Sequence, residues 1–402
     1  MPVRATKRGA ERTPLGERDC DVLVCGASFA GLAVARELAG SGAKVLVLDR
    51  YELGERQTSA CAMPTLWLDA LDLGDSELQS FDEIVTHTPF RSSRWALPWS
   101  FSTFDYRELC ALLWAQSGAD GAAAGPDGSE FELEIATVTG REGATVHTDR
   151  GSLRAPLIVD ALGWRRVLSN ASAIQPPDAP MSRGLEVHPA GTGAELELWI
   201  DPRYIRSGYA WSFPAREEVR VGVGSFWPAH HVKEPTVRLA RDLELPPDGY
   251  QGNWIPHKLR AAVEDEVFFA GDSAGHCLPL TAEGIRTALY FGLACGRELR
   301  AVLEGRSTRT QALARYGAFS AAHERKYRWL LNSQRTLGRL TPSRAITALA
   351  RGFENPRVSR WAFDHYLAIA PPSFVGEGAR RDRCEFLPYS PARSPAATGS
   401  RR

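Results

Sequence analysis

The sequence lacks long hydrophobic runs. No stretch of about 18 apolar residues occurs in its 402 residues, and a shorter run rarely crosses a bilayer as a helix. The basic N-terminal stretch also lacks the apolar segment of a secretory signal peptide. We therefore expect a cytoplasmic protein with no membrane-spanning segment.

Cysteine is scarce and charge is balanced. The seven cysteines lack the paired spacing of a metal site, and their odd number favours a reducing compartment. We predict free thiols and no bound metal. Basic and acidic residues each number 48, so the formal net charge is +0. No bulk attraction to nucleic acid exists, and no nucleic-acid partner is expected.

An apolar strand and a glycine-containing turn open the folded part of the chain. Residues 21–26 form an apolar run of strand length, and residues 27–40 carry apolar side chains at helical spacing. A second strand, residues 44–50, ends in an acid at the spacing of the ribose-binding acid of a dinucleotide-binding βαβ unit. The sequence predicts that such a site contains Gly26, Ser28, Phe29, Ala30, Gly31, Asp49 and Arg50.

One position of this turn departs from the usual glycine fingerprint. Gly26 makes the tight turn and Gly31 permits close helix packing, but Ser28 stands where a second glycine lets a pyrophosphate approach. Serine is small, keeps its backbone N–H and adds a hydroxyl that can bind phosphate. We retain the prediction, with a βαβ unit that binds no ligand as the alternative.

A second strand, turn and helix lie at residues 266–289. Gly271 allows a close backbone approach, and Asp272 places a carboxylate at the strand's carboxyl end, where sugar hydroxyls are often bound. Thr281 and Gly284 prepare a helix start whose free N–H groups carry roughly half a positive charge. This arrangement favours an anionic ligand, although it is also the commonest connection in α/β proteins.

Between these stretches the pattern changes from buried to alternating strands. Residues 155–163 repeat an apolar strand that ends in an acid and a glycine, Asp160 and Gly163. From residue 182 to residue 226, apolar and polar residues alternate between Gly and Pro turns, which is typical of an antiparallel sheet. Residues 83–104 alternate similarly and predict a hairpin. A second domain is therefore expected.

The order of these motifs resembles a known superfamily. The chain resembles flavoproteins of the p-hydroxybenzoate hydroxylase-like fold, and within them the geranylgeranyl reductases, including the digeranylgeranylglycerophospholipid reductases, over about residues 19–300. The most specific element is the YxWxFPx7GxG motif of that family. This chain reproduces it with Tyr209, Trp211, Phe213, Pro214, Gly222 and Gly224.

The resemblance implies FAD as the cofactor. Residues 271–285, GDSAGHCLPLTAEGI, resemble the family element GDAAGxxNPxTGEGI, with Leu278 in place of Asn and Ala282 in place of Gly. Asp272 would then bind the ribityl or pyrophosphate part of FAD, and residues 281–284 would present N–H groups to the pyrimidine edge of its ring. Besides the residues of the first turn, the implied cofactor-binding residues are Cys61, Arg107, Asp160, Gly163, Gly271, Asp272, Thr281, Gly284 and Ile285.

The resemblance also implies a reaction, the hydrogenation of C=C bonds in an isoprenoid chain. The YxWxFP motif would bind the chain, because alternate residues of a strand point to one face. Cys61 matches the cysteine that the family carries beside the flavin ring, although Ala62 follows it instead of glycine. The expected catalytic residues are Cys61, Tyr209 and Trp211, and the expected substrate-binding residues are Tyr209, Trp211, Phe213, Pro214, Gly222 and Gly224.

Three other functions remain open from the sequence. An aromatic hydroxylase shares the fold, but His276 comes one residue later than the histidine of that group. A flavin halogenase needs a relay lysine, and no lysine lies between Lys44 and Lys233. A non-catalytic polyprenyl-binding protein would fail to retain FAD. The electron donor, NAD(P)H or a redox protein, is left undecided because no second nucleotide fold is indicated.

We expect an α/β fold with a glutathione-reductase-type, Rossmann-like FAD domain, an inserted antiparallel-sheet substrate domain and C-terminal helices. The expected parts are a disordered segment (1–18), a discontinuous FAD-binding domain (19–80, 101–180 and 250–305), a substrate domain (81–100 and 181–249), a helical region (306–370) and a disordered tail (371–402).

Basic residues predominate in the C-terminal helical region. One acid, Glu354, accompanies nine basic residues between positions 325 and 360, and Trp329 and Trp361 lie in the same stretch. Each basic residue near anionic lipid contributes about 1 kcal/mol. Two interpretations follow, first an ordinary solvated face of these helices and second contact with the cytoplasmic face of a membrane.

Overall fold

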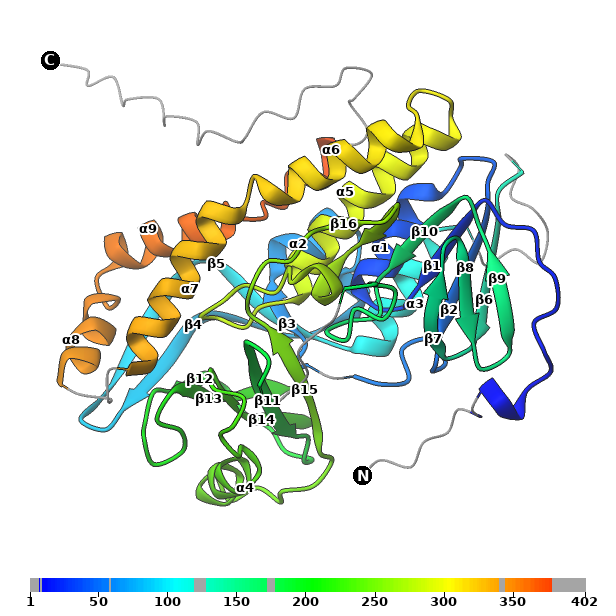
Figure 1. The fold of residues 1–402 in the computed structure, drawn as a ribbon. Coiled ribbons are helices and arrows are strands. Elements are labelled where there is room, and N and C mark those ends of the chain that lie inside the picture. The colour runs from blue at the N-terminus through cyan, green and yellow to red at the C-terminus, as the bar shows by residue number, and fades with distance from the viewer. Residues whose placement is uncertain are drawn as a thin grey trace, which may run out of the picture.

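The fold was analysed in a computed structural model that describes residues 7, 9–57, 59–118, 128–171, 178–339 and 344–377. Two sheets lie side by side, and a series of helices runs across both of them (Figure 1). The α/β class and the two-sheet arrangement agree with the expected fold.

The first sheet has six strands in the order β16-β17-β10-β1-β2-β6. Strand β1 pairs in parallel with β10 on one side and with β2 on the other, and all of its residues are buried. Its continuous apolar run therefore suits a strand that is covered on both faces. The strands are β1 (Val22–Cys25), β2 (Lys44–Asp49), β6 (Glu130–Ile135), β10 (Leu157–Asp160), β16 (Val263–Glu264) and β17 (Val267–Phe269).

A small three-stranded sheet stands beside the first one. It consists of β7 (Val138–Glu142), β8 (Thr145–Thr148) and β9 (Gly151–Arg154), which pair as an antiparallel meander.

The second sheet has eight strands in the order β15-β11-β14-β13-β12-β4-β5-β3. It takes in residues 62–64, 77–80, 101–104 and 251–256, which the expected division assigned to the first domain. The observed sheet differs from the expected division because its strands pair across long sequence separations. For example, β4 pairs in parallel with β12. The strands are β3 (Ala62–Pro64), β4 (Glu77–Thr88), β5 (Arg91–Phe104), β11 (Met181–Val187), β12 (Leu196–Trp199), β13 (Gly208–Ala215), β14 (Glu218–Ser225) and β15 (Gln251–Pro256).

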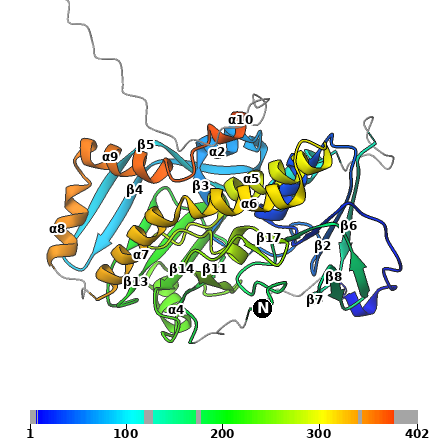
Figure 2. The ribbon, with the colours of Figure 1, turned by 45° about the horizontal axis from the view of Figure 1, so that its top comes forward.

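The C-terminal helices connect the two sheets. Helix α6 follows α5 over the first sheet, and α8 and α9 lie against the β4–β5 hairpin (Figure 2). Trp95 Nε1 donates to the carbonyl of Ala350 at 2.8 Å and fixes that contact. The helices are α1 (Phe29–Leu38), α2 (Thr65–Ala70), α3 (Tyr106–Ala115), α4 (Lys233–Asp242), α5 (Ile285–Leu303), α6 (Arg309–Ala321), α7 (Glu324–Arg339), α8 (Arg344–Gly352), α9 (Pro356–Leu367) and α10 (Phe374–Glu377), with 3-10 turns η1 (Gly9–Glu11), η2 (Gly74–Ser76) and η3 (Gly271–Ala274).

Two expectations of disorder are wrong where the structure describes the chain. Residues 9–18 pack on the first domain: Leu15 is buried, and Arg18 is paired with Glu134 at 2.6 Å. Residues 371–377 also fold, because Phe374 is buried against the helices. Both segments are held by distant partners that local composition does not reveal. Residues 1–6, 8 and 378–402 of the expected disordered ends lie outside the described residues.

Within the described ranges, no helix is both long and apolar enough to cross a membrane. The same ranges contain no cluster of His, Cys, Asp and Glu suited to a metal ion. The six cysteines that are described are buried and form no disulfide.

Helices α1 and α5 pack against each other at glycine positions. A Cβ on Gly292 would lie 2.6 Å from the carbonyl oxygen of Ala30 and 2.8 Å from Cβ of Ala33. A Cβ on Gly296 would lie 2.6 Å from Cβ of Glu37. Without side chains at these positions, the two helix backbones come close together.

We predict that Gly292→Ala destabilises the apoprotein by about 1–3 kcal/mol, because the added methyl group meets a backbone oxygen that cannot move freely. At a helical glycine with space for a methyl group, the same substitution would instead stabilise the protein. Gly317 in α6 is the matched control, since its added Cβ would meet its nearest atom at 3.7 Å. Gly317→Ala should be neutral or stabilising by up to about 1 kcal/mol. Urea unfolding measures both, and equal stability of the two variants would refute the packing argument.

Candidate functional site

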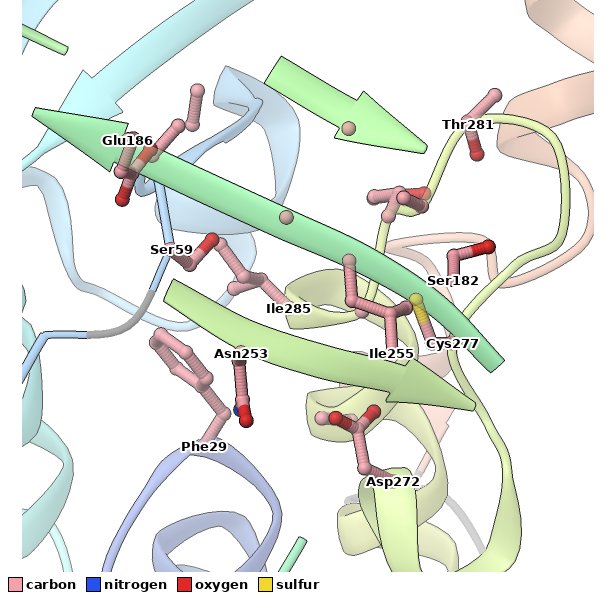
Figure 3. Close-up of a pocket in the computed structure, with 18 of the residues that line it drawn as sticks. Phe29, Ser59, Ser182, Glu186, Asn253, Ile255, Asp272, Cys277, Thr281 and Ile285 are labelled. Atoms are coloured by element: carbon pink, nitrogen blue, oxygen red, sulfur yellow. The ribbon is translucent and has the colours of Figure 1, made fainter. Parts of the chain in front are cut away.

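A large cavity lies between the two sheets and the C-terminal helices. Its volume is about 2950 Å³, well above the roughly 300–1,000 Å³ of an ordinary small-molecule site. The cavity therefore has room for more than one ligand. Figure 3 shows part of its wall, with Phe29, Asp272 and Ile285 below strand β11 and Glu186 and Ser59 near one end of that strand.

The first turn of the predicted dinucleotide site forms one end of the cavity. Gly26 has φ 115°, and a Cβ there would lie 2.3 Å from the carbonyl oxygen of Ala161, so glycine is required. Asp49 accepts hydrogen bonds from the N–H groups of Ala27 at 2.8 Å and Tyr51 at 3.0 Å. Burial raises the pKa of Asp49, and these bonds oppose the rise.

Most predicted residues of this turn face the cavity. The residues that line it are Gly26, Ser28, Phe29, Ala30, Asp49, Arg50 and, from α3, Arg107. Gly31 has a packing role instead, because a Cβ there would lie 1.8 Å from the carbonyl oxygen of Gly26.

Asp272 reaches the cavity from the second strand and turn. No described residue donates a hydrogen bond to its carboxylate, and burial raises its pKa to about 6, although Arg260 lowers it in part. A buried carboxylate without donors is costly. Hydroxyl groups of a ligand would supply those donors.

The loop before α5 is held in an unusual backbone conformation. Leu280 and Ala282 have φ 72° and 52°, values that favour glycine, and Ala282 stands where the resembling family has glycine. Leu280 N donates to Gln334 Oε1 at 2.7 Å, so α7 supports the loop. Thr281, Gly284 and Ile285 all line the cavity at the start of α5.

These residues fit FAD. The starts of two helices, α1 and α5, border one cavity, and free N–H groups at such starts attract anions. Asp272 supplies an acceptor for a polyol, while Arg50 and Arg107 bring positive charge to the wall. Phosphates, sugar hydroxyls and an electron-rich ring would each find a complementary partner.

An aromatic wall forms the side of the cavity on β13. Tyr209, Trp211 and Phe213 all line it, as alternation along the strand predicted. The rings of Tyr209 and Trp211 lie 5.9 Å apart. A Cβ on Gly222 would lie 2.2 Å from the Trp211 indole, so this glycine makes room for the ring.

The remaining motif residues support that wall from behind. A Cβ on Gly224 would lie 3.4 Å from the Trp211 indole, and Gly224 also lines the cavity. The carbonyl of Pro214 accepts a hydrogen bond from Thr103 at 2.9 Å, which joins β13 to β5.

An apolar branch extends from the aromatic wall toward the C-terminal helices. The sequence predicted a hairpin or two strands here and assigned residues 81–100 to the substrate domain, but it named none of their side chains as site residues. The branch is lined mainly by Ile84, Trp95, Phe101, Leu196, Leu198, Ile346, Phe353, Phe363 and Tyr366.

Five predicted site residues do not line the cavity: Gly31, Pro214 and Gly222, described above, and also Cys61 and Asp160. Cys61 is fully buried in the core, and burial raises the pKa of its thiol well above the usual value. Asp160 is also fully buried, and it accepts hydrogen bonds from Ser273 Oγ at 2.6 Å and Leu168 N at 2.8 Å. Its oxygens thus hold protein loops together, whereas Gly163 does line the cavity.

Sequence reasoning missed three polar residues of the wall. Cys277 from the second turn lines the cavity, as do Glu186 from β11 and His188, which directly follows that strand. An acid and a histidine two positions apart at the end of a strand were the only signal in the sequence for this pair.

Comparison with known proteins supports the resemblance drawn from the motifs. No protein-family profile matches the chain. A digeranylgeranylglycerophospholipid reductase of Methanosphaera stadtmanae is 23% identical over 336 residues, which are 76% of this chain and 83% of that protein. The predicted resemblance to the geranylgeranyl reductases is therefore confirmed.

Solved structures share the fold. A geranylgeranyl bacteriochlorophyll reductase-like protein of Thermoplasma acidophilum superposes with a TM-score of 0.74 at 17% identity, over 91% of this chain and 100% of that one. A probable FAD-dependent monooxygenase of Pseudomonas aeruginosa gives 0.58 at 19% identity, over 86% and 99%. The predicted fold class is confirmed.

We predict that Asp272→Asn weakens FAD binding about 10-fold to 100-fold, the effect of losing a charged hydrogen-bond acceptor. Flavin fluorescence titration of the apoprotein measures the dissociation constant. Asp69→Asn, an exposed carboxylate on α2 outside the cavity lining, is the control and should bind FAD normally. Unchanged affinity in Asp272→Asn would show that the carboxylate does not hold the cofactor.

The same variant should stabilise the apoprotein at high pH. Because the folded-state pKa of Asp272 is raised from 3.8 to about 6, the wild type loses stability as pH rises through that window. The loss is then about 2–3 kcal/mol at pH 8. Urea unfolding should find Asp272→Asn more stable by this amount at pH 8 and equal to wild type near pH 4. A constant difference across pH would contradict the assignment.

Proposed function

We propose that the protein is an FAD-dependent reductase that hydrogenates C=C bonds of an isoprenoid chain in a lipid, quinone or prenylated metabolite. The observation that carries the proposal is the continuity of one cavity, which joins the fitted cofactor end to an aromatic wall and an apolar branch. A linear hydrocarbon chain matches the apolar side chains that line that branch. The curated relative named as a reductase of such lipids supports the same reaction.

Each part of the site has a distinct task. FAD, when bound, supplies the hydride and is itself reduced by an external donor, NAD(P)H or a redox protein. Asp272 and the start of α5 orient the cofactor through an acceptor and backbone N–H donors. Tyr209 and Trp211 hold the chain beside it, and the apolar branch excludes water from the double bond.

The mouth of the apolar branch suggests how a lipid enters. Trp329, Leu349 and Trp361 line the cavity yet are 65%, 53% and 62% exposed. Arg325 and Lys326 line the same region. Exposed aromatic side chains beside basic ones suit the surface of an anionic membrane, and we propose peripheral contact there.

The first test is anaerobic reduction of the purified flavoprotein with polyprenyl substrates, followed by mass spectrometry. We predict a gain of two hydrogens for each double bond that is reduced. Trp211→Ala should lower the rate strongly because it opens the wall beside the chain. A gain of oxygen that requires air would instead favour the aromatic hydroxylase that shares this fold, and a purified protein without flavin absorbance would exclude both enzymes.

The second test measures binding to vesicles. The protein should sediment with vesicles rich in anionic lipid, and added salt should weaken the binding because the basic contacts are screened. Trp329→Ser with Trp361→Ser should reduce sedimentation, whereas Trp227→Ser, an exposed tryptophan outside the cavity lining, should not. Binding that is absent, or indifferent to these changes, would contradict the membrane contact.

A further inference from the structure

A buried acid and base lie at the end of β11 beside the aromatic wall. Glu186 is in the strand, and His188 directly follows Val187, the last residue of the strand. Their side chains are 3% and 6% exposed. Glu186 Oε1 lies 3.0 Å from His188 Nε2. Both residues line the cavity, and Figure 3 shows Glu186 near Ser59 at one end of its central part.

The pair directly adjoins the proposed substrate position. Trp211 Nε1 donates to Glu186 Oε2 at 3.3 Å, so the carboxyl group touches the ring that would hold the isoprenoid chain. Glu186 Oε1 and His188 Nε2 are buried, and their orientation does not give an aligned hydrogen bond. A buried carboxyl group with unused hydrogen-bonding capacity is costly in an apolar site, which favours a functional role.

Further polar groups connect the pair with the surface. His188 Nδ1 lies 3.9 Å from Glu218 Oε1. The side chain of Glu218 is 37% exposed and is paired with Arg220 at 2.8 Å. Gln251 Nε2 also approaches His188 Nδ1, at 3.4 Å. Polar groups therefore extend from His188 to the partly exposed Glu218.

We propose that Glu186 is the catalytic acid that protonates the double bond, and that His188 is a positioning residue that returns the proton to it. This proposal rests on the proposed reductase function. Hydrogenation needs one hydrogen as hydride and one as a proton, and the cofactor accounts for the hydride alone. Glu186 is the carboxyl group that contacts the aromatic wall, through the indole N–H of Trp211.

The proposed step is balanced. The O–H bond of Glu186 breaks as the π electrons of the alkene form a C–H bond with that proton, and positive charge develops on the other alkene carbon. FAD, when bound and reduced, would supply the hydride with its two electrons that the second C–H bond needs. The indole face of Trp211 and the new carboxylate both stabilise the developing charge. His188 then reprotonates Glu186.

The test uses Glu186→Gln in the FAD-loaded protein. We expect hydrogenation to slow about 100-fold or more, the usual contribution of a general acid. The FAD dissociation constant, and polyprenyl binding followed by tryptophan fluorescence, should stay within about twofold of wild type. The matched control is Glu197→Gln in the same sheet, whose carboxylate pairs with His87 at 2.9 Å outside this cavity lining. It should retain the wild-type rate.

His188→Ala provides a second, independent measurement. We expect slower hydrogenation with unchanged substrate binding, and a rate that rises with added imidazole, which a purely structural role would not produce. If Glu186→Gln fails to fold, this rescue decides the proposal, and its absence overturns it. A folded Glu186→Gln protein that keeps more than a third of the wild-type rate also overturns it. A wild type that hydrogenates nothing refutes the proposed function instead.

Discussion

The close approach of α1 and α5 is the constraint on which the site depends. Gly292 and Gly296 let the helix backbones pack without intervening side chains. Residues at the starts of both helices line one cavity. Helix starts carry partial positive charge and attract anions. The cavity is therefore favourable for an anionic group.

A buried ion pair at the start of α5 connects this helix with the C-terminal part of the chain. Arg286 pairs with Glu283 at 2.7 Å and also donates to the carbonyl of Ala370 at 2.8 Å. The loop that begins α5 is therefore tied to the chain that follows α9. Since breaking one side of a buried pair commonly costs about 3–5 kcal/mol, the cofactor loop and the helices over the apolar branch are coupled in stability. Cofactor and substrate regions are built as one unit.

Much of this arrangement could be predicted from local patterns. Apolar runs that end in glycine or acid located the central strands, and alternation on residues 209–213 placed three rings on one wall. Local patterns could not reveal whether a side chain bonds to neighbouring protein groups or faces the cavity. Asp160 ends β10 and Asp272 follows β17 in the turn η3, but only the oxygens of Asp160 are occupied by neighbouring protein donors. The apolar branch was missed because it forms only when β4 pairs with β12, far away in the sequence.

The sequence motifs do not explain how an isolated double bond becomes reactive, and the proposed role of Glu186 offers an explanation. An isolated double bond is a poor hydride acceptor, so a wall of aromatic rings that only holds the chain would not make it reactive. Protonation by a neighbouring acid makes the second carbon electron-poor. The Trp211 indole donates its N–H to Glu186, and in the proposed function its face would bind the chain. This one side chain would then keep the alkene close to the acid, and Gly222 leaves the space that the ring needs.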